Sequence, residues 1–114
     1  MSVVDDLLLQ DAAFSEIPGM RGLRVARLGQ RDGKTLEVIE AAKGVVIPAM
    51  THPSGESGRV LQGSIRFTRA GIMELMRAGA TWRIEANQAQ GPHVSLEDGT
   101  RVAILRDGRS AFDP

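Results

Sequence analysis

Two histidines and one nearby carboxylate are the side chains of this sequence whose types and spacing could do chemistry. His52 and Glu56 lie four residues apart, and the second histidine, His93, lies far along the chain. A histidine beside a carboxylate can perform acid–base chemistry, and both residue types are ligands of divalent metal ions. The chain contains no cysteine, which excludes disulfides, thiolate metal sites and a cysteine nucleophile. Acid–base chemistry and metal binding are therefore the candidate activities of this stretch.

The composition is that of a small soluble domain. The chain has 114 residues, enough for one domain with one continuous core. Its 14 basic and 14 acidic residues give a formal charge of zero, which argues against nucleic acid or an anionic membrane as a partner. The acidic N-terminus is unlike a signal peptide, and no apolar run approaches the ~20 residues that span a bilayer. We expect a single domain over residues 1–114 and a cytoplasmic location.

The pattern of glycines and apolar residues indicates short β-strands. Gly63, Gly71 and Gly79 repeat every eight residues, a spacing typical of the strands of a sandwich or barrel. Apolar and polar residues alternate in four segments, residues 36–38, 64–68, 81–85 and 101–104. Trp82 belongs to the third of these and is expected in the core.

Two other segments are ambiguous in composition. Residues 72–77 contain good helix formers, but they lie between Gly71 and Gly79, and so short a segment does not form a stable helix. We therefore predict a strand there. Residues 4–14 are expected to form either a short N-terminal helix or an edge strand followed by a turn.

The stretch around His52 resembles the first motif of the cupin superfamily. In that motif two histidines stand two residues apart, with Glu or Gln four residues after the second and a glycine seven residues further on. His52, Glu56 and Gly63 match the second, third and fourth of these positions, and Pro48 and residues 60–63 match the usual flanks. The first motif is therefore present except for its first histidine.

Residues 79–90 resemble the second cupin motif, and residues 95–105 resemble the strand that usually follows this motif. The resemblance covers about residues 20–107. It implies an all-β fold, the double-stranded β-helix (jelly-roll) barrel of the small, single-domain RmlC-like cupins. The N-terminal helix or edge segment would precede this barrel.

The resemblance also implies a degenerate metal site. In metal-binding cupins, three histidines and the Glu or Gln converge inside the barrel. Met50 stands at the first histidine position and Gln90 at the last, so only His52 and Glu56 match. These two fall short of the three protein ligands typical of a catalytic metal site. Replacing Met50 and Gln90 by histidine is then expected to complete a site.

Two interpretations of these residues remain open. In one, no metal binds and His52 is a pocket-lining, hydrogen-bonded histidine. In the other, His52 and Glu56 hold Mn, Fe, Ni or Zn together with either Gln90 or His93. His93 would take the second-motif position if residues 88–92 carry insertions.

Three functional hypotheses follow from the resemblance. The first is a metal-independent protein that binds a small polar molecule, such as a sugar or an organic acid, in a pocket of Met50, His52, Glu56 and Gln90. His52 and Glu56 could then act as catalytic acid–base residues. The second is a metal-dependent oxygenase, isomerase or lyase. The third is a non-enzymatic module that senses a ligand or forms a dimer; cupins commonly pair, and the apolar residues 7–9 favour a homodimer.

Overall fold

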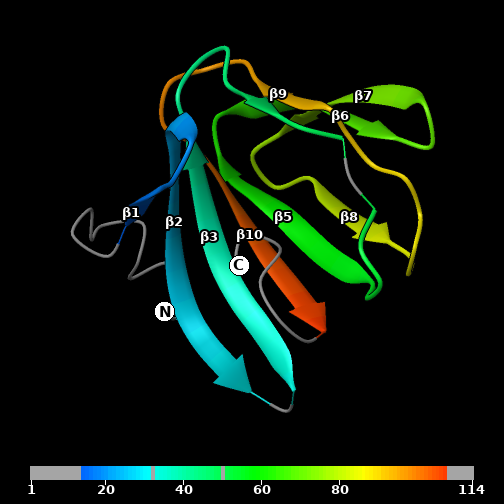
Figure 1. The fold of residues 1–114 in the computed structure, drawn as a ribbon. Helices are drawn as coiled ribbons and strands as arrows, with labels where there is room; N and C mark the ends of the chain where they lie inside the picture. The colour runs from blue at the N-terminus through cyan, green and yellow to red at the C-terminus, as the bar shows by residue number, and fades with distance from the viewer. Residues whose placement is uncertain (1–13, 32, 50, 108–114) are drawn as a thin grey trace.

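Every regular element that the structure describes is a β-strand. The structure is a computed structural model, and it describes residues 14–31, 33–49 and 51–107. Its strands form two antiparallel sheets (Figure 1). The larger sheet has the strand order β1 (Ser15–Ile17), β2 (Met20–Arg31), β3 (Lys34–Ala41), β10 (Thr100–Asp107), β5 (Glu56–Gln62) and β8 (Thr81–Ile84). The smaller sheet has the order β4 (Val46–Ile47), β9 (His93–Ser95), β6 (Ser64–Arg69) and β7 (Ile72–Arg77).

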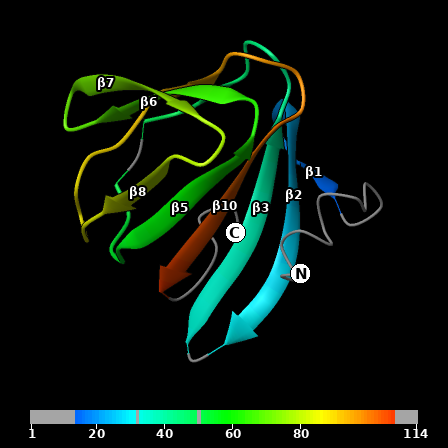
Figure 2. The same cartoon turned by 180° about the vertical axis from the view of Figure 1, so that it is seen from behind.

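The two sheets pack face to face as a sandwich. Residues from both inner faces form one apolar core, which includes Leu23 and Val60 of the larger sheet and Phe67 of the smaller sheet. The long strands β2 and β3 extend beyond the smaller sheet (Figure 2). The prediction of an all-β jelly-roll fold is thus confirmed. Within the described residues there is no helix that is long and apolar enough to cross a membrane.

Most of the predicted strands are present. The segments 64–68, 72–77 and 81–85 correspond to β6, β7 and β8, and the ambiguous segment 72–77 is a strand as predicted. Trp82 is buried, and it shares the inner face of β8 with Ile84. Period-two alternation was therefore a sound guide to these elements.

The prediction of one strand over residues 95–105 is wrong. A turn at residues 96–99 separates β9 from β10, and the two strands belong to different sheets. The hydroxyls of Ser95 and Thr100 both donate to the carbonyl oxygen of Glu97, at 2.8 and 3.0 Å. These short-range bonds satisfy the carbonyl within the turn, so the chain can pass from one sheet to the other.

The predicted N-terminal helix or edge segment lies outside the described residues except for Phe14. Residues 7–9, expected to contribute to a dimer contact, also lie outside them. Phe14 is buried on a second, smaller apolar cluster with Ala26 and Val38. The guanidiniums of Arg24 and Arg101 lie 5.3 and 4.5 Å from its ring centroid, a cation–π geometry that stabilises the packing of this residue.

Strand β3 has buried residues on both of its faces. The alternation at residues 36–38 places Leu36 and Val38 on one face, and Val38 belongs to the smaller cluster around Phe14. The other face carries Glu37 and Ile39, and both are buried between the sheets. A carboxylate is thereby placed in the main core, where it needs a partner.

Candidate functional site

The inward-facing side chains at one end of the larger sheet are charged. Arg106 of β10 lies directly opposite Glu56 of β5, so their side chains project from the same face. Glu37 of β3 lies opposite Ile104, which is two residues from Arg106 on that face. The side chains of Arg106, Glu56 and Glu37 are 3%, 3% and 1% exposed. Three neighbouring strands therefore bring one cation and two carboxylates together in the core.

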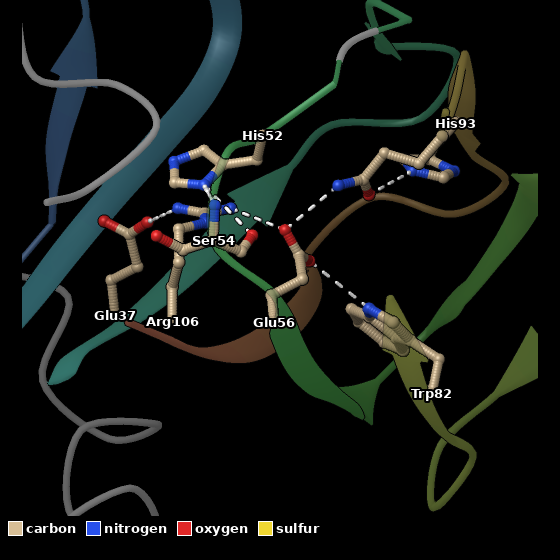
Figure 3. A network of polar contacts seen from close by, with 8 residues as sticks. Glu37, His52, Ser54, Glu56, Trp82, His93 and Arg106 are labelled. Carbon is tan, nitrogen blue, oxygen red and sulfur yellow. Dashed lines mark hydrogen bonds and ion pairs between the residues drawn. The ribbon is translucent and has the colours of Figure 1, made fainter. Parts of the chain in front are cut away.

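Arg106 bonds to both carboxylates, and Figure 3 shows its side chain between them. Its Nη2 donates to Glu56 Oε1 at 2.8 Å, and its Nη1 donates to Glu37 Oε1 at 3.2 Å. Such pairing is required, because a buried charge without a partner is strongly destabilising. The Nε atom of Arg106 is also buried, and within the described chain it has no hydrogen-bond partner. The Nε–H of Arg106 is thus directed at no acceptor in the described part of the chain.

Glu56 is the centre of the network. Besides Arg106, it accepts a hydrogen bond on Oε1 from Gln90 Nε2 at 3.1 Å and a long one on Oε2 from Trp82 Nε1 at 3.4 Å (Figure 3). Trp82 reaches Glu56 because its indole lies across Gly58, its partner in the ladder. A Cβ at Gly58 would lie 2.0 Å from the ring atom Cζ2. The missing side chain of Gly58 therefore makes room for the indole.

His93, on β9 of the smaller sheet, is joined to this network through Gln90. The backbone N–H of Thr68 donates to His93 Nδ1 at 3.1 Å, so the ring proton is on Nε2, which donates to Gln90 Oε1 at 3.2 Å. The ring stacks on Phe67 with centroids 4.2 Å apart. Burial lowers the pKa of His93 from 6.5 to about 4, and the charge of Glu56 opposes part of this shift. The imidazole is therefore neutral at pH 7.

The network borders a cavity between the sheets. The cavity is small, with a volume of about 30 Å³, and it is partly open to solvent. Glu56, Gln90, His93, Trp82 and Arg106 line its polar side, and the other walls are apolar side chains of both sheets. Its lining, apolar with a few convergent polar groups, is of the kind found in small-molecule sites, and its volume is enough for about two water molecules.

The structure places the sequence-predicted residues in different surroundings. Glu56, Gln90 and His93 line the cavity, so the two alternatives for the second motif, Gln90 and His93, are neighbours in one network. His52 is half-buried in the loop between β4 and β5, where its Nδ1 accepts the N–H of Ser54 at 3.1 Å. Among the described contacts, none joins His52 to Glu56. Met50 lies outside the described residues.

The described donors do not fit a divalent metal ion. In this part of the chain there is no group of three or more histidine and acidic side chains that could hold one. Both ring nitrogens of His93 already have hydrogen-bond partners, and Glu56 is paired with a guanidinium. A metal ligand needs a free lone pair and no competing cation next to it. The arrangement instead suits hydrogen bonding to an uncharged or weakly charged molecule.

Arg106 and Glu37 are the site residues that the sequence analysis missed. Arg106 continues the inward alternation of Val102 and Ile104, so a charged residue at the next inward position was the available signal. The sequence gave no comparable signal for Glu37, because its two neighbours along the chain, Leu36 and Val38, are both apolar.

Comparison with known proteins shows likeness in fold. The sequence matches no protein-family model and no curated protein. Among solved structures, KdgF from Halomonas sp. is similar with a TM-score of 0.79 and 17% identity, over 86% of this chain and 87% of that one. An RmlC-like cupin from Shewanella frigidimarina has a TM-score of 0.76 and 20% identity, over 88% and 87% of the two chains.

A third structure extends the likeness. A cupin superfamily protein from Desulfitobacterium hafniense has a TM-score of 0.68 and 11% identity, over 79% of this chain and 81% of that one. All three structures cover most of both chains, and the identities are too low to carry a ligand or a reaction from one protein to another. This chain has the cupin fold, in the form of the small RmlC-like cupins.

Proposed function

We propose that this protein binds a small polar molecule in the cavity through Arg106, without a metal ion. The observation that carries the proposal is the Nε–H of Arg106, which is buried and has no acceptor among the described residues, while the side chain lines the cavity. A buried donor without a partner costs about 1–3 kcal/mol. A ligand oxygen that accepts this hydrogen bond recovers that cost.

The geometry favours a neutral oxygen over a carboxylate as the ligand group. Each Nη atom of Arg106 already donates to a carboxylate, Glu37 or Glu56, and Nε is the guanidinium nitrogen without an acceptor among the described residues. Carboxylate ligands are commonly held by two parallel N–H bonds from one guanidinium, whereas both Nη atoms of Arg106 already donate to carboxylates of the protein. Among the described residues, Glu56 Oε2 has one long bond, from Trp82 at 3.4 Å, and can accept a ligand hydroxyl. A hydroxyl group, such as that of a sugar or polyol, therefore matches this donor and acceptor better than a carboxylate does.

Binding, rather than acid–base catalysis, is the activity that these residues support. Burial keeps the pKa of His93 near 4, so the ring is neutral at pH 7, and the lone pair of its Nδ1 already accepts the N–H of Thr68. Glu56 accepts hydrogen bonds on both oxygens. The pair first considered for catalysis, His52 and Glu56, has no described contact.

A ligand screen with a tryptophan signal tests the proposal. Trp82 is the chain's single tryptophan, it lines the cavity and it contacts Glu56. We expect neutral sugars or polyols to change its fluorescence saturably and to raise the melting temperature, because a ligand stabilises the folded state to which it binds. Small carboxylates are screened beside them, and tighter binding of carboxylates would contradict the assignment of a neutral oxygen.

A pair of conservative variants makes the test specific to Arg106. Arg106→Lys keeps the charge but removes the Nε–H, so binding of the best ligand should weaken about tenfold, the cost of one lost hydrogen bond. Arg83→Lys is the matched control, since Arg83 is 75% exposed on β8. Equal affinity of both variants and the parent would show that Arg106 does not bind the ligand.

A further inference from the structure

We propose that the guanidinium of Arg106 takes the place of a metal cation in this barrel and is itself the group that keeps divalent ions out. The inference rests on the metal-free binding proposed above and adds its cause. The substitution Gln90→His alone would add a third metal-ligating side chain next to Glu56 and His93.

The three donor positions lie in a row across the cavity. Gln90 stands between Glu56 and His93, with its amide nitrogen 3.1 Å from Glu56 Oε1 and its amide oxygen 3.2 Å from His93 Nε2. All three side chains are at most 5% exposed. An imidazole at position 90 would therefore stand between a carboxylate and a second imidazole, the ligand types that Zn²⁺ and Co²⁺ prefer.

Arg106 is the obstacle to metal binding in this row. Its Nη2 lies 2.8 Å from Glu56 Oε1, the same oxygen that faces Gln90. A metal ion on that carboxylate would lie within a few ångströms of the guanidinium, where repulsion between two cations in the core is strong. The neutral amide of Gln90 suits this arrangement, since it donates to the carboxylate and accepts from His93.

Arg106 also links neighbouring strands, as a bound metal cation would. From β10 it links Glu37 of β3 to Glu56 of β5 and so crosslinks three adjacent strands through the inner face. A metal ion that joins ligands from several strands stabilises a barrel in the same way. With the guanidinium in place, the site has its positive charge and its crosslink without a metal.

The test measures Co²⁺ binding by the visible absorption of the bound ion. It compares the parent, Gln90→His, Gln90→His/Arg106→Met and the control Gln90→His/Arg83→Met. We expect Gln90→His and its Arg83 control to gain little affinity over the parent, and the Arg106→Met double variant to bind Co²⁺ at least tenfold more tightly than either. If Gln90→His and Gln90→His/Arg106→Met bind Co²⁺ with equal affinity, the proposal is overturned. This holds whether both proteins bind the ion tightly or neither binds it.

Loss of Arg106 removes a buried cation that contacts both Glu37 and Glu56, so folding is followed in the same samples. Circular dichroism and thermal melting are recorded with and without Co²⁺, and we expect the metal to raise the melting temperature of the Arg106→Met double variant alone. If that variant is unfolded even with metal, Glu37→Gln is added to every member of the series, which removes one of the two carboxylates, and the same comparison decides. Stoichiometric Co²⁺ binding by the parent would overturn the metal-free function itself, whereas failure of the variants alone overturns only the role of Arg106.

Discussion

The free energy of unfolding should fall by about 3 kcal/mol as the pH is lowered from 6.5 to 4, because of His93 alone. Burial lowers the pKa of this imidazole to about 4 in the folded protein, against 6.5 in the unfolded chain. Between these values the unfolded chain binds a proton that the folded protein does not bind. Stability from this group is therefore fully present above pH 6.5, is lost at roughly 1.4 kcal/mol per pH unit below it, and changes little below pH 4.

Urea unfolding of the parent and of His93→Gln at several pH values isolates this effect from the titration of carboxylates. The variant loses the stacking on Phe67, but the difference in stability between parent and variant should shrink steadily from pH 6.5 to pH 4. NMR titration of His52→Gln gives the pKa directly, because His93 is then the only histidine. A midpoint near 6.5, or a constant difference between the two proteins, would contradict the buried neutral imidazole.

Gly58→Ala should destabilise the protein by about 2–3 kcal/mol or more, the range of severe overpacking in a core. A methyl group there would lie 2.0 Å from Cζ2 of Trp82, so the indole has to move and its hydrogen bond to Glu56 is lost. The fluorescence of Trp82 should shift to the red as the ring becomes exposed. Urea unfolding and the emission maximum measure the two effects.

Ser57→Ala is the matched control for Gly58→Ala, because Ser57 is the preceding residue on β5 and is exposed. We expect its stability and emission maximum to stay close to those of the parent. A Gly58→Ala protein with unchanged stability and emission would mean that the indole does not lie across Gly58, and the contact between Trp82 and Glu56 would then be wrong as well.

The strands could be predicted because their signals are local. Period-two alternation placed Trp82 and Ile84 on one face, and two glycines limited residues 72–77 to a short strand, despite their helix-forming composition. The split of residues 95–105 into two strands depends on hydroxyl bonds to one carbonyl, at Glu97, which alternation does not reveal. The cupin resemblance also placed Glu56 and Gln90 near each other, through motif spacing.

The partners of these residues could not be predicted in the same way, because they are distant in sequence. Arg106 is 50 residues from Glu56 and 69 from Glu37, and its contacts depend on the strand order and on the register of β10. Glu37 lies between apolar neighbours in a strand buried on both faces, so its sequence gave no sign of which face it occupies. The sequence predicts that Met50→His and Gln90→His together complete a metal site. The structure adds a further requirement, because the positive charge of Arg106 beside Glu56 must also be removed.

The metal content of the protein as purified shows directly whether a metal ion occupies the site beside Arg106. Cells are grown with Mn, Fe, Co, Ni, Cu and Zn supplied together, and the protein is purified without chelator and analysed by elemental mass spectrometry. Since Arg106 provides the positive charge beside Glu56, we predict that each metal is present well below one equivalent per chain, and that Glu56→Gln does not change its amount. One equivalent of a transition metal per chain, lost in Glu56→Gln, would mean that Glu56 is a metal ligand despite its contact with Arg106.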